Sequence, residues 1–141
     1  MGIQTPVIYN SVKTDSSFGS VTINNLNETY TEIYSYTGYG TFFGAVMKLS
    51  ATGITIKLEV DGFDVFEVTA SSLASFLGNL NSKDVKPGGS LPLYYDNKKH
   101  FHIQYPAPIQ YKESIRILAR ANSGNNTRRI DGYIASLTKE G

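Results

Sequence analysis

His100 and His102, the two histidines of the chain, are the residues whose type and spacing come nearest to a metal site. On a β-strand, residues two apart point to the same face, so both imidazoles would lie side by side. A transition metal needs one or two further ligands. Because the chain has no cysteine, these must be carboxylates such as Asp96, or groups from another strand or a symmetric copy. The pattern is more typical of a polar strand face.

A second group consists of tyrosines. Tyr30, Tyr34 and Tyr36 share strand parity, and Tyr39 follows in the adjoining turn, which predicts an aromatic stripe with hydroxyls at its edge. Such a stripe suits a protein neighbour, because tyrosine is enriched at interfaces, or a sugar that stacks on the rings. The third interpretation places the stripe in the core, where each hydroxyl needs a hydrogen-bond partner. All three remain open at this stage.

No spaced catalytic motif accompanies these residues. The chain lacks a Gly-x-Ser-x-Gly elbow, and Gly38-Tyr39-Gly40 precedes a strand without the lysine of a phosphate loop. The acidic residues of segment 59–67 lie around one exposed hairpin. Contact with solvent explains acidic residues at such a place, so they do not indicate the paired carboxylates of glycoside hydrolysis. We therefore expect a protein that is not an enzyme and that carries no cofactor.

The charge balance narrows the classes of partner. Thirteen Lys and Arg stand against twelve Asp and Glu in 141 residues, which gives a net charge of +1. This is too balanced for a main partner that is a nucleic acid or an anionic membrane, so neither is expected. Residues 1–10 show no secretory signal, and no apolar run approaches the length of a membrane span.

The clearest strand that could position such residues begins at Ile54. Apolar and polar residues alternate through Val60, and Asp61-Gly62 then supplies a two-residue turn, so a hairpin is predicted over residues 54–68. A short helix is expected at about residues 71–80, followed by a Pro- and Gly-rich loop. A second hairpin, over residues 91–104, carries both histidines on its return strand.

Further strands are predicted on both sides of these hairpins. In the last one, at about 129–138, Ile130 and Ile134 would share one face and Tyr133 and Leu137 the other. About eight or nine short strands with one short helix favour an all-β fold, an antiparallel β-sandwich or jelly roll, with residues 1–141 as a single domain. The remaining strands are expected at 20–23, 29–36, 42–49 and 114–121.

Residues 53–68 (GITIKLEVDGFDVFEV), the Ser- and Leu-containing helix after them, and the segments 93–96 and 114–118 resemble small bacteriophage virion proteins. The resemblance covers about residues 53–120 and transfers no functional residue. It implies a β-sandwich or jelly-roll subunit of a virion, such as a capsid decoration, head-fibre or tail component. Its partners would be copies of itself and other virion proteins, through strand edges and tyrosine-rich surfaces.

Two alternatives belong to other classes. The first is a carbohydrate-binding β-sandwich that uses Tyr30, Tyr34, Tyr36 or Tyr39 as stacking platforms. The second is a small cupin-like metalloprotein that uses His100 and His102.

Overall fold

Strands with alternating apolar residues dominate the chain, as the sequence predicts. The computed structural model of the protein describes residues 13–78, 93–96, 99–105, 107–122 and 128–140. The described strands are β1 (Lys13–Leu26), β2 (Thr31–Thr37), β3 (Gly40–Leu49), β4 (Ile54–Val60), β5 (Phe63–Thr69), β6 (Leu93–Tyr95), β7 (His100–Ile103), β8 (Ile109–Tyr111), β9 (Ser114–Ala121) and β10 (Arg128–Leu137). One helix, α1 (Ala70–Gly78), follows β5 directly.

The two predicted hairpins are present. Asp61 and Gly62 join β4 to β5 with φ values of 53° and 84°, the positive region that an Asp-Gly turn favours. β6 and β7 form the second hairpin, in which Tyr94 pairs with His102. The helix lies close to its predicted position, although residues 79 and 80 fall outside the described part of the chain.

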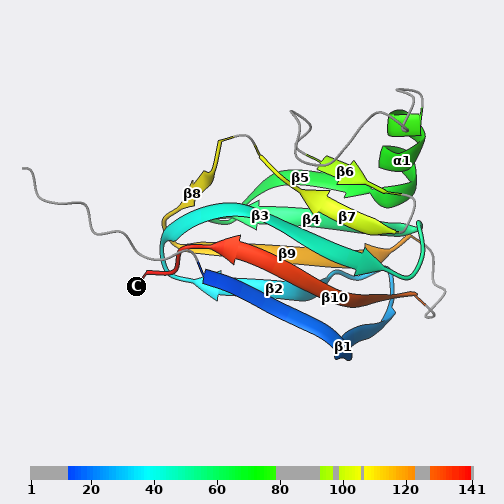
Figure 1. Ribbon diagram of the computed structural model, residues 1–141, viewed down its shortest axis with the longest axis horizontal. Coiled ribbons are helices and arrows are strands. Elements are labelled where there is room, and N and C mark those ends of the chain that lie inside the picture. Colours follow the sequence, from blue (N-terminus) through cyan, green and yellow to red (C-terminus); the bar gives the residue numbers. More distant parts are fainter. Residues whose placement is uncertain (1–12, 79–92, 97–98, 106, 123–127, 141) are drawn as a thin grey trace, which may run out of the picture.

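The strands form two antiparallel sheets that pack face to face (Figure 1). In sheet A the order is β1-β10-β3-β7-β6, with β8 also paired to β3, and in sheet B it is β2-β9-β4-β5. Most connections cross from one sheet to the other, and the first and last described strands lie side by side. This is the strand order of a jelly roll, and it confirms the predicted all-β sandwich. The described residues form ten strands, against the eight or nine predicted, and β8 was not predicted.

The core lies between the sheets. Inward-facing side chains of β3 and β7 from sheet A meet those of β4 and β9 from sheet B, and all are almost fully buried. Each such residue alternates with one on the outer face of its sheet, so the two outer faces remain as surfaces on which function can reside. The largest of the buried side chains include Phe42, Met47, Phe101, Ile56, Leu58, Ile115 and Ile117.

Candidate functional site

The predicted tyrosine stripe is divided between the two faces of sheet B. A β-bulge in β2 lies between Glu32 and Tyr34, so that Ile33 has no partner of its own on β9. The extra residue reverses the alternation, and Tyr30 therefore lies on the outer face while Tyr34 and Tyr36 turn toward the core. The expectation that the three share a face was wrong, because it assumed regular alternation through the bulge.

Tyr34 is 7% exposed and connects the two sheets. Its hydroxyl donates a hydrogen bond of 2.6 Å to the Asp15 carboxylate on β1, and its ring packs 5.6 Å from that of Tyr133. Burial and the bond to Asp15 raise the pKa of Tyr34 above its usual range. Burial also opposes ionisation of Asp15, but bonds from Lys139 and Tyr34 outweigh it and lower the pKa of Asp15. Tyr34 is a core residue in this chain.

Tyr36 is half-buried against the core near the end of β2, beside residues 138–140. Its hydroxyl donates to the Glu140 carbonyl oxygen at 3.1 Å, and its ring meets Tyr111 edge to face at 6.1 Å. The Tyr111 hydroxyl donates to the Thr138 carbonyl oxygen, and burial raises the pKa of Tyr111 to about 12. These contacts hold the chain terminus onto the sandwich. Tyr39, in the β2–β3 turn, is 52% exposed and keeps its ring free for a partner.

Tyr30 lies on the outer face of sheet B, next to two cationic side chains. Lys57 Nζ is 4.5 Å from the ring centroid and the Arg120 guanidinium carbon is 5.6 Å from it, and the hydroxyl donates to Glu67. Burial and this bond raise the pKa of Tyr30. The ring is engaged within its own chain on this side and does not present a bare stacking surface.

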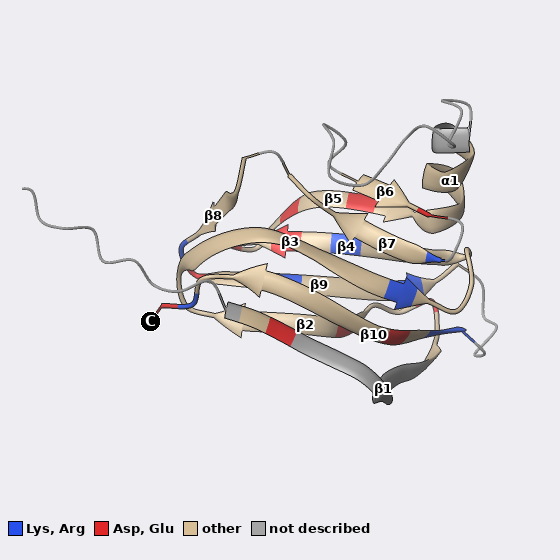
Figure 2. Cartoon of the chain, in the orientation of Figure 1, with Lys and Arg blue, Asp and Glu red and all other residues tan. Residues whose placement is uncertain are grey.

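The rest of this outer face is a network of paired charges, visible as interleaved blue and red on β4, β5 and β9 in Figure 2. Arg116 bonds to Glu59 at 3.0 Å and to Glu32 at 3.1 Å. Lys57 Nζ lies 3.9 Å from Glu59 and 3.7 Å from Asp64. These five charges already have opposite neighbours and gain little from a partner, so this part of the face is suited to contact with water.

On the outer face of sheet A, the structure brings His100 and His102 together with Asp96. The Asp96 Oδ2 atom lies 3.1 Å from His102 Nε2 and 3.4 Å from His100 Nδ1, while its Oδ1 atom accepts the His100 backbone N–H. The Tyr94 ring packs against His102 with centroids 5.8 Å apart. Within the described ranges, no group of three or more ligating side chains is arranged to hold a metal ion.

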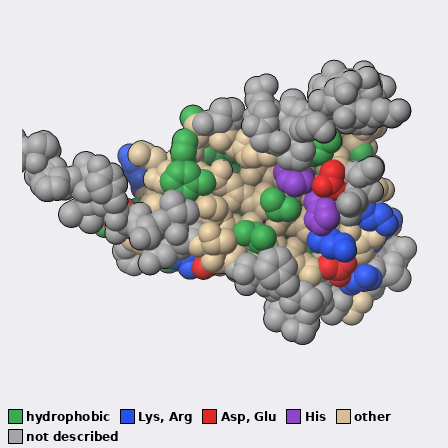
Figure 3. Space-filling view, viewed as in Figure 1, with side chains coloured by type: hydrophobic (Ala, Val, Ile, Leu, Met, Phe, Trp, Pro, Cys, Tyr) green, Lys and Arg blue, Asp and Glu red, His purple; other side chains and the backbone are tan. Residues whose placement is uncertain are grey.

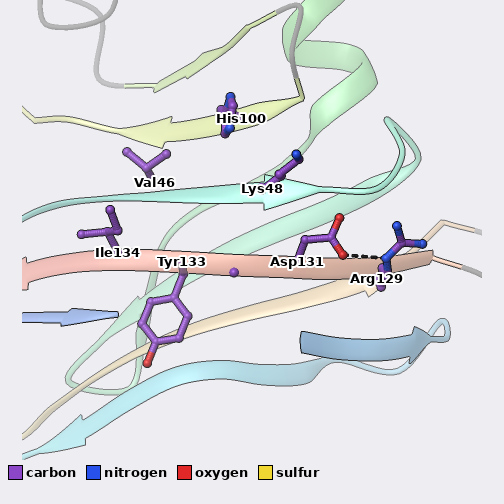
Figure 4. Close-up of a pocket in the computed structure, with 8 residues that line it drawn as sticks. Val46, Lys48, His100, Arg129, Asp131, Tyr133 and Ile134 are labelled. Atoms are coloured by element: carbon purple, nitrogen blue, oxygen red, sulfur yellow. Dashed lines mark hydrogen bonds and ion pairs between the residues drawn. The ribbon is translucent and has the colours of Figure 1, made fainter. Parts of the chain in front are cut away.

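Beside the histidines, the outer face of sheet A is hollowed. We call this depression the sheet A hollow; its volume is about 580 Å³, and it is lined by Val46, Lys48, His100, Arg129, Asp131, Gly132, Tyr133 and Ile134. Figure 3 shows apolar side chains in the middle of this face, with the histidines and charged residues toward one end. In Figure 4, Val46 projects from β3 and Ile134 projects from β10, whereas the Tyr133 ring points away from both of them. Volumes of this size accommodate small ligands or single side chains.

The position of Ile134 corrects a second expectation. Ile130 is buried in the core while Ile134 is 38% exposed, so they do not share a face. A register shift lies between Ile130 and Gly132, whose φ of 153° is readily adopted by glycine. This irregularity directs Tyr133 inward and leaves Ile134 in the sheet A hollow. A glycine inside a strand pattern is the signal that would have revealed it.

The β4–β5 tip, residues 61–65, is a further exposed apolar feature, and sequence reasoning did not single it out. Phe63 follows the Asp61-Gly62 turn and is 77% exposed, the most open large apolar side chain of the described residues. Asp61 fixes this tip, since its carboxylate accepts backbone N–H bonds of 2.7–3.1 Å from residues 112–114. Val65 on the same strand is 39% exposed. β5 lies at the edge of sheet B, paired only with β4.

Comparison with known proteins adds little to this geometry. No family model matches the sequence, and no curated protein matches it. Among solved structures, the chain is similar to dimeric latent PorU from Porphyromonas gingivalis, with 14% sequence identity and a TM-score of 0.30. The match covers 90% of this chain and 10% of that one, so the chain spans about a tenth of its length. At this TM-score the likeness carries no argument. Among the described residues there is also no helix long and apolar enough to span a membrane.

Proposed function

We propose that this chain is a non-enzymatic structural subunit of a bacteriophage virion, which binds copies of itself and a larger capsid or tail assembly. The observation that carries the proposal is the contrast between its surfaces. The outer face of sheet B is occupied by paired charges, whereas the sheet A hollow and the β4–β5 tip expose apolar side chains. Exposed apolar groups beside polar ones are typical of surfaces that become buried in an assembly.

The jelly-roll strand order supports the same proposal without deciding it. Double-sheet jelly rolls occur in viral capsid proteins, and they also occur in lectins and cupins. Function therefore has to be argued from the surface rather than from the fold. In an assembly with many copies, weak individual contacts add up, because each subunit is held by several neighbours at once.

Light scattering of the purified protein over a concentration series, from micromolar to millimolar, tests self-association. We expect the mass to exceed 15.5 kDa and either to reach a defined oligomer or to rise with concentration. A mass that stays at the monomer value throughout the series would contradict self-assembly.

The carbohydrate-binding alternative retains one observation in its favour, the exposed ring of Tyr39. A glycan array separates the two functions. Binding that is lost in Tyr39→Ala, in a protein that stays monomeric, would replace the virion proposal by the carbohydrate-binding one.

A further inference from the structure

The floor of the sheet A hollow is apolar and stays partly exposed in the described part of the chain. Val46 on β3 and Ile134 on β10 are register partners and both project outward (Figure 4), and Ile134 is 38% exposed. The charged residues that line the hollow lie toward its helix end, where Arg129 already bonds to Asp131 at 2.6 Å. An occupant of the floor is therefore apolar and uncharged, because an unpaired charge would lose its hydration there.

The twelve residues that precede β1 have this composition. Residues 1–12 (MGIQTPVIYNSV) contain no Asp, Glu, Lys, Arg or His. Besides Met1, their large apolar side chains are those of Ile3, Val7, Ile8, Tyr9 and Val12. Contact of such side chains with water costs about 25 cal/mol for each Å² of apolar surface, so the segment gains stability when it covers an apolar surface.

The start of β1 lies beside the hollow. In the register of β1 with β10, Ser16 pairs with Ile134, and Lys13 begins the strand three positions earlier. The first residue of β1 is therefore about 10 Å along the strand and about 5 Å across one strand spacing from the floor. Twelve extended residues span about 40 Å, which is ample even after the chain reverses direction. Asn10 and Ser11, residue types that favour turns, stand where the reversal is needed.

We propose that residues 1–12 fold back over sheet A of their own chain and cover the sheet A hollow. In an extended segment Val7 and Tyr9 point to the same side, and they are the residues that meet the floor formed by Val46 and Ile134. Because the segment is tethered beside the hollow, its effective concentration there is on the order of millimolar, which favours it over a free partner.

This inference goes beyond the proposed function and does not depend on it. An assembly partner that uses the sheet A hollow has to displace the segment first. The β4–β5 tip belongs to the other sheet and is not part of this contact.

A spin label on the segment tests the cover in the intact chain. The sequence has no cysteine, so Gln4→Cys provides a single attachment site. The label should strongly weaken the methyl NMR signals of Val46 and Ile134, whereas Val65, on β5 of the other sheet, should keep its intensity. Full intensity at Val46 and Ile134 would overturn the proposal.

A mixed sample shows whether the segment covers its own chain. Spin-labelled chains are combined with isotope-labelled chains that carry no spin label, so only contacts between copies weaken the NMR signals. We expect no weakening in this sample. Weakening as strong as that within one chain would replace the intramolecular cover by an exchange of segments between copies.

A charge placed in the segment should release it. Val7→Asp puts a carboxylate on the apolar floor, so the docked fraction should fall about 10-fold or more relative to the free one, and the signals of Val46 and Ile134 should recover. Asn10→Asp adds the same charge at the position of the turn and is the matched control, in which the signals should stay weakened. Equal weakening in both variants would contradict the proposed contact of Val7.

A charge placed in the hollow gives the reciprocal test. Ile134→Asp should restore the Val46 signal, and Val65→Asp, at a side chain that is 39% exposed against 38% for Ile134, is the matched control and should leave it weakened. Thermal unfolding checks that each variant folds, and an unchanged midpoint is expected because both replaced side chains are exposed. If Ile134→Asp lowers the midpoint, Val7→Asp decides the test, because it leaves every described residue unchanged.

The light-scattering series tests the proposed function separately. Self-association together with full NMR intensity at Val46 and Ile134 overturns the cover alone. A chain that stays monomeric with these signals weakened overturns self-assembly alone and supports the cover.

Discussion

Asp61 provides the sharpest test of how the β4–β5 tip is held. Its carboxylate accepts backbone N–H bonds from Lys112, Glu113 and Ser114, and its own φ is 53°. Replacement by alanine removes all three bonds and also places a residue with poor tolerance of positive φ in the turn. Charge-assisted bonds are each worth about 1.5–3 kcal/mol when shielded, and less at this partly exposed site, so we take about 2 kcal/mol for the set. The positive φ adds about 1 kcal/mol.

Asp61→Ala should therefore lower the free energy of unfolding by about 3 kcal/mol, whereas Asp61→Asn should lower it by about 1 kcal/mol. Asparagine tolerates the positive φ and keeps one acceptor oxygen, but its amide places a donor against the Lys112 N–H. Urea unfolding, followed by far-UV circular dichroism, measures both. If the alanine variant is within about 0.5 kcal/mol of the wild type, the three bonds do not stabilise the fold.

The same residue predicts a pH dependence. Burial opposes ionisation of Asp61, but the three N–H donors outweigh burial and lower its pKa below the ordinary value of 3.8. The stabilisation is therefore complete above pH of about 4 and is lost as the pH falls through the lowered pKa of the folded state. Asp61→Asn should reduce the loss of stability between neutral pH and about pH 2, relative to wild type. An equal loss in both proteins would assign the acid sensitivity elsewhere, for instance to Asp15, whose pKa is also lowered.

Three further changes test the core and the sheets by chemical unfolding. Phe101→Ala, at a fully buried ring between the sheets, should cost about 3–5 kcal/mol. Tyr34→Phe should cost about 1 kcal/mol through the lost bond to Asp15, and NMR titration should show the pKa of Asp15 rising toward 3.8. Gly44→Ala should cost more than about 1 kcal/mol, because φ is +154° and the new Cβ atom would lie 2.5 Å from the Ile103 carbonyl oxygen. A loss below about 0.5 kcal/mol in any of the three would contradict the packing described for that residue.

Local sequence determined the strands and turns whose defining pattern lies within a few consecutive residues. The alternation over 54–60 and the Asp61-Gly62 turn together specified one hairpin, and the strand at 114–121 was predicted at its observed limits. The many short strands with a single short helix were enough to give the all-β class. These features follow from backbone geometry and side-chain periodicity, which a sequence displays directly.

Tertiary structure decided which face each side chain occupies where a strand is irregular. The irregularities at Ile33 and Gly132 each reverse the alternation, so Tyr34 became a core residue and Ile134 became part of a surface hollow. Whether a strand takes up an extra residue depends on the register of its partners, β9 for β2 and the pair β1 and β3 for β10.

The candidate interaction surfaces were beyond sequence reasoning for the same reason. The sheet A hollow is assembled from β3, β7 and β10, which are distant in the chain, and the exposure of Phe63 depends on what packs beside the turn. Alternation of apolar and polar residues indicates that a residue faces outward. Only the packing of the two sheets decides whether that outward position is covered by charges, as on sheet B, or left open to a partner, as on sheet A.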